Sequence, residues 1–115
     1  MRSFFDRNQP AADVRVYRVT VRGRFGSLDE ATRAYLTREQ PEHDIFKSAY
    51  TTEGTFTYDE RIQFFNLRYE IRCDGESDGP ETLARQEAEI FLRTLKIPHV
   101  ITKVSVVDTS TMWNE

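Results

Sequence analysis

The chain has 115 residues, of which 30% are charged and 38% are hydrophobic, with a formal net charge of -3 and a pI near 5.4. A chain of this length favours one domain, its acidic balance argues against a strongly basic nucleic-acid-binding domain, and its single cysteine excludes an internal disulfide or a cysteine metal cluster. No apolar run reaches the roughly 18 residues of a membrane helix and the first residues lack a signal-peptide pattern, so we expect a soluble, cytoplasmic protein.

Residues 1–13 are polar around one Phe pair, and we expect them to form a flexible N-terminal arm. Residues 14–25 then alternate between apolar and polar side chains with a period of two, which predicts a half-buried strand. A glycine on its apolar side, Gly23, relieves crowding or marks a bulge. The apolar side carries Tyr17, Val19, Val21 and Phe25, and the polar side carries Arg18, Thr20, Arg22 and Arg24.

The next segment, residues 27–40, has apolar residues at helical spacing and is predicted to be a helix. Ser27 followed three residues later by Glu30 forms a capping-box pattern at its start. Pro41 ends the helix, because proline has no backbone N–H and disfavours helical backbone in the residue before it.

Two alternating segments, 45–58 and 61–73, predict a hairpin whose turn is Asp59-Glu60. This register places Gly54 opposite Phe65, where the glycine makes room for the ring. Asp-Glu is not a preferred tight turn, and a longer turn would shift the pairing. The predicted inner face of the hairpin carries Phe46, Tyr50, Phe56, Phe65, Leu67, Tyr69 and Ile71.

A polar loop leads into a second helix that begins at Pro80, with Asp78 as a capping residue. Residues 100–108 alternate again and form the last predicted strand. We therefore expect one domain over residues 14–109 and a C-terminal tail over residues 110–115. The buried stripe of the second helix is predicted to contain Ala84, Ala88, Phe91, Leu92 and Leu95.

The order strand, helix, strand, strand, helix, strand predicts an α+β fold, the ferredoxin-like β-α-β-β-α-β sandwich. Right-handed crossovers place the first and third strands in the centre of a four-stranded antiparallel sheet, with both helices on one face. The other face is left open to water or to a partner. Proteins of this fold often pair through the open face, so a homodimer in the form of a dimeric α+β barrel is one expected assembly.

Strand parity gathers positive charge on the open face of this acidic protein. On that face only Glu53 and Glu70 oppose the basic residues. Seven of the sixteen basic residues are predicted to lie there: Arg18, Arg22, Arg24, Lys47, Arg68, Arg72 and Lys103. The last strand is predicted to add Ile101, Ser105 and Val107 to the same face.

Several runs of the sequence, taken together, resemble a known family. They are Tyr17-Arg-Val-Thr-Val-Arg-Gly23, Glu42-His-Asp44, Thr52-Glu-Gly-Thr-Phe-Thr-Tyr-Asp59, and the Phe64-Phe65 pair followed by Arg68. The pattern is similar to a small bacterial family of unknown function with a ferredoxin-like fold, over about residues 16–108. The N-terminal arm and the end around Met112 and Trp113 lie outside the resemblance. The family has no assigned activity, so the resemblance implies no catalytic residue.

The arginines of the open face are the strongest candidates for ligand binding. Guanidinium groups bind carboxylates and phosphates through paired hydrogen bonds, and alternate residues of a strand lie about 6.5–7 Å apart. We therefore predict that Arg18, Arg22 and Arg68 hold the oxyanion groups of a ligand. Thr20 and Asn66 are the polar binding residues beside them. The competing interpretation is a solvated strand face held by ion pairs.

His43 and Glu53 are the candidate catalytic residues. Histidine transfers protons near neutral pH, so His43 is a candidate general base, although a loop or capping histidine is the simpler interpretation. Glu53 is expected opposite Asn66 and beside Arg68, where a carboxylate serves better as an anchor or a structural ion pair than as a proton donor. Asp44 need not orient His43, because adjacent residues of an extended segment point in opposite directions.

These residues favour three functions. The first is binding of a small anionic or polar metabolite on the basic face, one form of which is a cofactor-independent enzyme of the cyclase, isomerase or tailoring type. The second is a structural or assembly module that dimerises through this face. The third, single-stranded nucleic-acid binding, is disfavoured because RNA-binding sheets need two or three exposed aromatic residues and this face offers Phe64. No metal or cofactor is expected, since no known ligand motif occurs.

Overall fold

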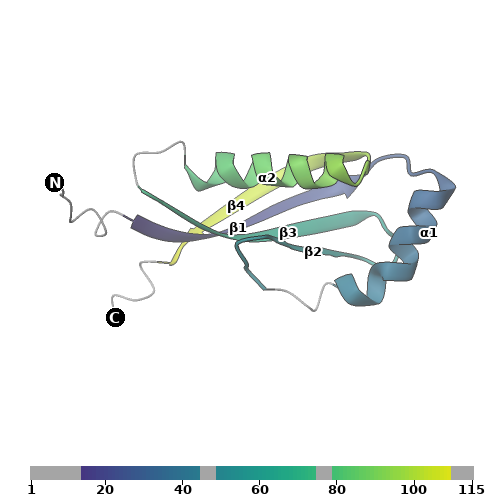
Figure 1. Cartoon of the computed structure of the whole chain (residues 1–115), viewed down its shortest axis with the longest axis horizontal. Coiled ribbons are helices and arrows are strands. Elements are labelled where there is room, and N and C mark those ends of the chain that lie inside the picture. The colour runs from purple at the N-terminus through teal and green to yellow at the C-terminus, as the bar shows by residue number, and fades with distance from the viewer. Residues whose placement is uncertain (1–13, 45–48, 75–78, 110–115) are drawn as a thin grey trace.

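The computed structural model in Figure 1 describes residues 14–44, 49–74 and 79–109. Within these residues, four strands form one antiparallel sheet in the order β2-β3-β1-β4, accompanied by two α-helices. The predicted α+β class and the central position of the first and third strands are therefore confirmed. The elements in chain order are β1 (Val14–Phe25), α1 (Glu30–Glu39), the short 3-10 helix η2 (Gln40–His43), β2 (Thr55–Tyr58), β3 (Phe64–Asp74), α2 (Pro80–Thr94) and β4 (His99–Asp108).

The inner face of the sheet is apolar because the side chains of its strands alternate as the sequence does. In the β1–β3 ladder, Val19 lies opposite Tyr69 and Val21 lies opposite Leu67, and all four side chains are buried. Aromatic rings extend this core toward β2, with neighbouring ring centroids 5.2 to 6.4 Å apart. These rings belong to Phe25, Phe56, Tyr58 and Phe65.

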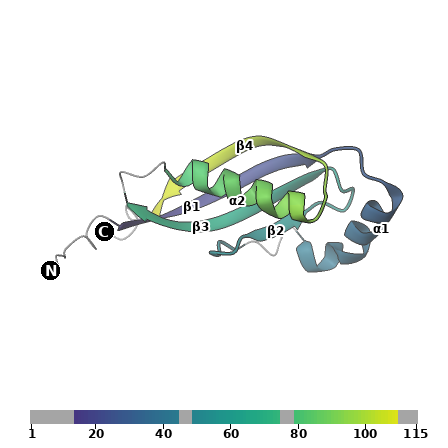
Figure 2. The same cartoon turned by 45° about the horizontal axis from the view of Figure 1, so that its top comes forward.

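α2 lies on this inner face, whereas α1 lies beyond the end of the sheet (Figures 1 and 2). α2 runs along the sheet and buries Ala84, Ala88 and Leu92. Leu95 follows the end of this helix and is 39% exposed, so its predicted place in the buried stripe is wrong. α1 lies at the end of the sheet near β2, where Leu36 is buried and its carbonyl oxygen accepts a hydrogen bond from the Tyr58 hydroxyl. α2 thus covers the inner face as predicted, α1 contributes Leu36 to the same core from the end of the sheet, and a cavity remains between the two helices.

The α1 helix begins later than predicted, because Asp29 rather than Ser27 is its N-cap. The Asp29 carboxylate accepts a hydrogen bond from the backbone N–H of Thr32, with an O–N distance of 2.7 Å. Hydrogen bonds from the Thr32 backbone and side chain lower the pKa of Asp29 from its ordinary value. At the other end the α-helix stops at Glu39, and Pro41 lies within the 3-10 helix η2.

The hairpin of β2 and β3 has a different register from the predicted one. Tyr58 pairs with Phe65, so the predicted pair of Tyr58 with Arg61 is wrong, and Gly54 does not lie opposite Phe65. The partner of Tyr58 is residue 65 and not residue 61, so the register differs from the predicted one by an even number of residues. Phe56 and Phe65 therefore stay on the inner face, since side-chain direction repeats every second residue.

Asp59 accounts for the longer connection between these strands. Its carboxylate accepts hydrogen bonds from the backbone N–H groups of Gln63 and Phe64, each with an O–N distance of 2.9 Å. Its backbone carbonyl accepts a third, from the N–H of Ile62, at 3.1 Å. Ile62 has a φ of 56° and is buried, so the loop adds a side chain to the core through a left-handed backbone conformation.

Gly23, and not Gly54, makes room for Phe65. Gly23 and Phe65 are paired across β1 and β3, and a Cβ atom at Gly23 would lie 2.5 Å from Phe65 Cζ. The β1–β4 register also shifts between Arg22 and Gly23, which confirms that this glycine both relieves crowding and marks a bulge. Because of this shift, Ile101 lies opposite Gly23 and packs against the core, so its predicted place on the open face is wrong.

Tyr50 lies on the outer face of the sheet, whereas parity along the predicted strand placed it in the core. Its hydroxyl oxygen is 2.9 Å from Thr20 Oγ1 of β1. The cause is a turn in which Gly54, with a φ of 97°, donates its N–H to the Thr51 hydroxyl. This turn interrupts the predicted strand, of which β2 is the remaining part, and the period-two pattern cannot be extended across it.

The last two elements begin close to their predicted positions. α2 starts at Pro80 as predicted, after Gly79 with a φ of 96°. β4 begins at His99, one residue before the predicted strand. The features outside the described residues are the N-terminal arm (1–13), Phe46 and Lys47 of the predicted hairpin, the capping residue Asp78 and the tail (110–115).

Candidate functional site

The outer face of the sheet is the one away from α2 (Figures 1 and 2). The register of β1 and β3 places the predicted binding residues on this face. In the β1–β3 ladder, Arg22 pairs with Asn66 and Thr20 pairs with Arg68. Arg18 lies two residues before Thr20 on the same face. Direct and diagonal neighbours on one sheet face lie about 4.5 to 8 Å apart, so these five side chains form one continuous surface.

Lys103 extends this surface on the other side of β1. It pairs directly with Arg22, on the strand β4. Arg68 is the diagonal neighbour of Arg22 on β3, so three cations converge from three adjacent strands. Like charges at directly opposed positions repel each other and lower the stability of a sheet. We name Arg18, Arg22, Arg68 and Lys103 the basic cluster.

Two polar side chains hold guanidinium groups of the basic cluster. Arg22 Nε donates a hydrogen bond to Asn66 Oδ1 at 3.1 Å, and Arg68 Nη1 donates one to Thr57 Oγ1 at 3.0 Å. Asn66 is 7% exposed and Thr57 is 1% exposed, so both anchors are shielded from water. A guanidinium has five N–H donors, and each of these bonds occupies one of them. The arginines are therefore oriented while most of their donors stay available to a ligand.

In the part of the chain that the structure describes, the one carboxylate directly opposite a member of the basic cluster is Glu70, which faces Arg18 across β1 and β3. On the outer face of β3, Arg72 forms an ion pair with Glu70 at 3.1 Å. Arg22, Arg68 and Lys103 have no such partner among residues 14–44, 49–74 and 79–109. The interpretation of this face as a set of ion pairs fits Arg72 but not the basic cluster.

Tyr50 is a residue of this site that parity analysis missed. The Arg18 Cζ atom lies 5.4 Å from the centroid of the Tyr50 ring, and the hydroxyl of Tyr50 is hydrogen-bonded to Thr20. Tyr50 therefore adds an aromatic ring beside the cations. The signal that could have placed it is Gly54, since a glycine after several polar residues favours a turn rather than a continued strand.

The two candidate catalytic residues are not part of the basic cluster. His43 lies on the helix side of the sheet, where its ring stacks on Tyr58 with centroids 5.7 Å apart. Glu53 is exposed in the turn before β2, and the residue opposite Asn66 is Thr57, so the predicted position of Glu53 is wrong. The sheet separates His43 from the arginines, and no proton transfer between His43 and a ligand at the basic cluster follows from this geometry.

Two further searches concern the described residues only. Among them, no group of three or more His, Cys, Asp or Glu side chains is placed to hold a metal ion. No helix in residues 14–44, 49–74 and 79–109 is long and apolar enough to cross a bilayer. The free cysteine, Cys73, is half-buried near the end of β3.

Comparison of the sequence with known protein families identifies one family to which the chain belongs. A model described as a family of unknown function, DUF6204, matches residues 12–114. The chain belongs to this family. The match confirms the predicted membership of an uncharacterised family, and it extends beyond residues 16–108 to include Met112 and Trp113. No curated protein matches the chain, and no solved structure matches it.

Proposed function

We propose that the protein binds a small anionic metabolite at the basic cluster on the outer face of its sheet. The observation that carries the proposal is the pairing of Arg22 with Lys103, two cations directly opposed across β1 and β4, with Arg68 diagonal to Arg22 on β3. No carboxylate among the described residues relieves this repulsion. A bound carboxylate or phosphate would replace repulsion by charge-assisted hydrogen bonds.

The geometry favours a ligand with two oxyanion groups. Arg22 and Arg68 are diagonal neighbours, whose Cβ atoms lie about 7–8 Å apart or somewhat less. Each keeps N–H donors that its bond to Asn66 or Thr57 does not use. Thr20 lies opposite Arg68 and two residues before Arg22, so its hydroxyl is beside both groups. A dicarboxylate or a phosphorylated carboxylic acid is the ligand class that fits.

Binding is better supported than catalysis at this face. A cofactor-independent enzyme needs a group that accepts or donates a proton, and His43 lies on the other side of the sheet. Glu53 is exposed in a turn and is not paired with Asn66. The arginines, which stay charged throughout the physiological range, hold anions but are not general bases.

Dimerisation through the same face is the second candidate. Three apolar side chains flank the basic cluster and are largely exposed: Phe64 at 57%, Val100 at 46% and Val107 at 46%. A second copy of the chain that covered them would enclose the cations between two sheets. An anion buried between the sheets would then neutralise the cations. If dimerisation depends on the ligand, anion binding and dimerisation are therefore two properties of the same assembly.

Nuclear magnetic resonance titrations of the ¹⁵N-labelled full chain with succinate, citrate and inorganic phosphate at low ionic strength test the proposal. We expect amide shift changes centred on Arg22 and Asn66. Arg22→Gln and Arg68→Gln should each weaken binding roughly tenfold or more, because a hydrogen bond to a charged group contributes about 1.5–3 kcal/mol. Arg72→Gln is the matched control, since it removes one charge from the same face but an arginine that already has a carboxylate partner.

Five results would contradict the proposal. An equal loss of affinity in Arg72→Gln would show that bulk charge, and not the basic cluster, attracts the anion. Shift changes confined to other elements, or no binding of any of the three probes, would remove the site. A single-stranded RNA that binds more tightly than the probes and is released steeply by salt would favour the nucleic-acid alternative. A dimer that forms equally well without any anion would favour the assembly module.

A further inference from the structure

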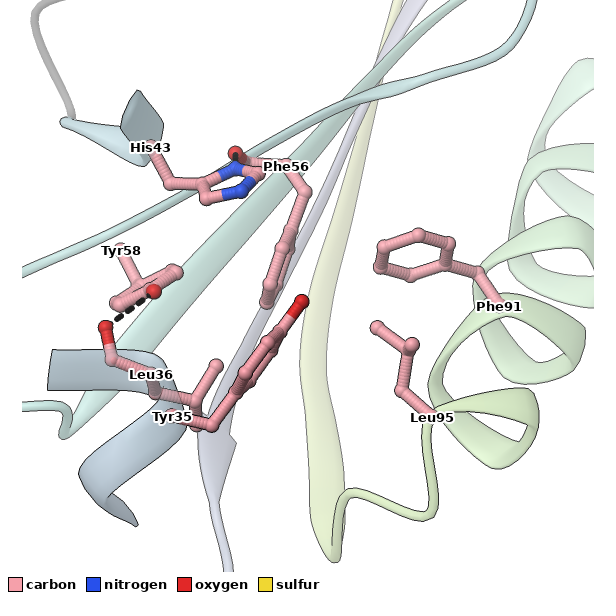
Figure 3. A pocket seen from close by; sticks show the side chains of 7 residues that line it. All are labelled: Tyr35, Leu36, His43, Phe56, Tyr58, Phe91 and Leu95. Carbon is pink, nitrogen blue, oxygen red and sulfur yellow. Dashed lines mark hydrogen bonds between the residues drawn. The ribbon is translucent and has the colours of Figure 1, made fainter. Parts of the chain in front are cut away.

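A cavity of about 190 Å³ lies on the helix side of the sheet, between α1, β2 and the C-terminal end of α2 (Figure 3). It exists because α1 lies at the end of the sheet and α2 runs along it, so that neither helix fills the corner between them. Aromatic side chains from all three elements form most of its wall. The lining residues are Tyr35, Leu36, His43, Phe56, Tyr58, Phe91 and Leu95.

The hydrogen bonding of His43 determines which of its nitrogens carries the proton. Nδ1 lies 2.8 Å from the carbonyl oxygen of Phe56. A carbonyl oxygen can only accept, so Nδ1 is the donor and carries the hydrogen. In the neutral ring, Nε2 is then a bare acceptor. Among the described residues no group is hydrogen-bonded to Nε2, which leaves one acceptor on the wall of the cavity.

Packing holds the imidazole in this orientation. Its ring stacks on Tyr58 at an interplanar angle of 21° and lies against Phe56 with centroids 5.6 Å apart. The Tyr58 hydroxyl is occupied by its bond to the Leu36 carbonyl and does not compete for a ligand. Tyr35 directs its hydroxyl into the cavity from α1 (Figure 3). The polar groups that can reach a ligand are therefore the Tyr35 hydroxyl and the acceptor on His43.

Size and charge define the ligand that this cavity would take. An apolar cavity of about 150 Å³ is large enough to bind benzene, so 190 Å³ accommodates one aromatic ring with a small substituent. Rings such as Phe56 and Phe91, with centroids 5.1 Å apart, favour edge-to-face contact with another ring. Among the described residues that line the cavity there is no Lys, Arg, Asp or Glu, so this part of the wall would not stabilise a charged ligand.

We propose that this cavity binds a neutral, single-ring aromatic alcohol of the phenol class, whose hydroxyl donates a hydrogen bond to His43 Nε2. The aromatic wall supplies the apolar contact, and the fixed tautomer of His43 supplies the specificity. A bare acceptor discriminates strongly between a ligand that donates and one that cannot. The site is on the opposite side of the sheet from the basic cluster, so this proposal does not depend on the proposed anion binding.

Tyr35 and Leu95 form the exposed rim of the cavity. They are 44% and 39% exposed, and both also line a second hollow of about 210 Å³ between α1 and the end of α2. Long side chains with this exposure can change rotamer on the nanosecond timescale. Ligand entry therefore needs movement of these two side chains and not of the sheet. A para substituent on the ring would extend toward this second hollow.

Titrations of the full chain with phenol and with anisole, which has the same ring but no donor, test the proposal. We expect phenol to shift the amides of Phe56 and Phe91 and to bind at least about tenfold more tightly than anisole. The ¹⁵N resonances of the His43 ring should show hydrogen on Nδ1, and Nε2 should respond to phenol but not to anisole. These measurements need no substitution, so they do not depend on a variant that folds.

A pair of substitutions separates the acceptor from the packing. His43→Asn keeps an N–H donor for the Phe56 carbonyl, but its shorter side chain places no acceptor at the position of Nε2, so phenol and anisole should bind equally. Leu95→Trp should fill the cavity and abolish binding of both, while anion binding at Arg22 is unchanged. Equal affinity for phenol and anisole in the natural chain, hydrogen on His43 Nε2, or no phenol binding at millimolar concentration would each overturn the proposal.

Discussion

The two faces of the sheet differ in how deeply their side chains are buried and in whether their charges have partners. In the core between the inner face and α2, side chains such as Val19, Leu67 and Leu92 are completely or almost completely buried. On the outer face, Arg22 and Lys103 are exposed, directly opposed and without a carboxylate partner among the described residues. Burial on one face stabilises the fold, while the arrangement on the other lowers its stability.

This difference separates residues that maintain the fold from residues that are candidates for function. An unfavourable arrangement that packing does not require is more informative about function than a buried apolar residue. On the inner side of the sheet, packing is incomplete at the cavity beside His43. Both candidate sites are therefore places where the structure leaves an interaction unsatisfied: cations without anions on one face, and an acceptor without a donor on the other.

The largest expected effect is on the inner face. Leu67→Ala should lower the free energy of unfolding by about 2–5 kcal/mol, because Leu67 of β3 is 1% exposed and its loss leaves a cavity in the core. Urea denaturation measures this change. Arg24→Ala, an exposed residue of the outer face, is the comparison and should change stability by less than about 0.5 kcal/mol. Similar losses for the two variants would contradict the division between the faces.

The second largest loss of stability is expected at Gly23, where β1 lies close to the Phe65 ring. Gly23→Ala should destabilise the protein by about 1–3 kcal/mol, because the new Cβ would lie 2.5 Å from Phe65 Cζ and 2.6 Å from the Val100 carbonyl oxygen. Adding Phe65→Leu should recover part of the loss by removing the ring contact. A double-mutant cycle measures this coupling. Additive losses would show that Gly23 is needed for the bulge alone.

Two buried phenols of the inner face should make stability depend on alkaline pH. Burial raises the pKa of Tyr58 and of Tyr69 from 10.0 to about 12, with Glu39 and Glu87 as smaller causes. The unfolded chain loses these protons first, so stability falls as the pH rises from about 10 to about 12. The slope is up to about 1.4 kcal/mol per pH unit for each tyrosine.

Phenolate absorbance and denaturant titrations at increasing pH measure this dependence. Tyr58→Phe should remove the contribution of one tyrosine to the slope of the free energy of unfolding against pH. It also removes the hydrogen bond to the Leu36 carbonyl, which lowers stability at neutral pH. If the slope between pH 10 and 12 is the same in Tyr58→Phe as in the natural chain, the Tyr58 hydroxyl is not buried in solution.

The smallest expected effect has the opposite sign and lies on the outer face. Lys103→Glu should raise the free energy of unfolding by about 0.2–1 kcal/mol, because it turns a repulsive pair with Arg22 into an attractive one. The gain should shrink at high salt. The same substitution should weaken binding of succinate or phosphate. A variant that is less stable than the natural chain at low salt would show that Lys103 has a stabilising partner.

Much of the fold could be predicted because local patterns and overall topology agree. The alternation in residues 14–25 and the stripe of Ala84, Ala88 and Leu92 were sufficient to assign β1 and α2 and the side that each buries. The predicted positions of Arg22 and Asn66 side by side on the outer face follow from the same alternation, and the β1–β3 ladder contains this pair.

The errors occur where the chain leaves the regular pattern. Tyr50 was placed on the wrong face because a turn closed by Gly54 and Thr51 interrupts the predicted strand. Ile101 was placed on the wrong face because a bulge at Gly23 changes the parity of β4. In both cases one irregular position reverses the assignment of the residues beyond it, and hydrophobicity alone does not locate that position.

The sequence by itself determined which side chains are buried and which are charged, because the hydrophobic effect acts on a pattern that is written along each strand and helix. Only the tertiary structure decided which of them meet. The pairing of Arg22 with Lys103, the contact of Tyr50 with Arg18, and the cavity between α1 and α2 all join segments that are distant in the chain. Such contacts depend on register, bulges and the reach of each helix, which are set by the packing of the whole domain.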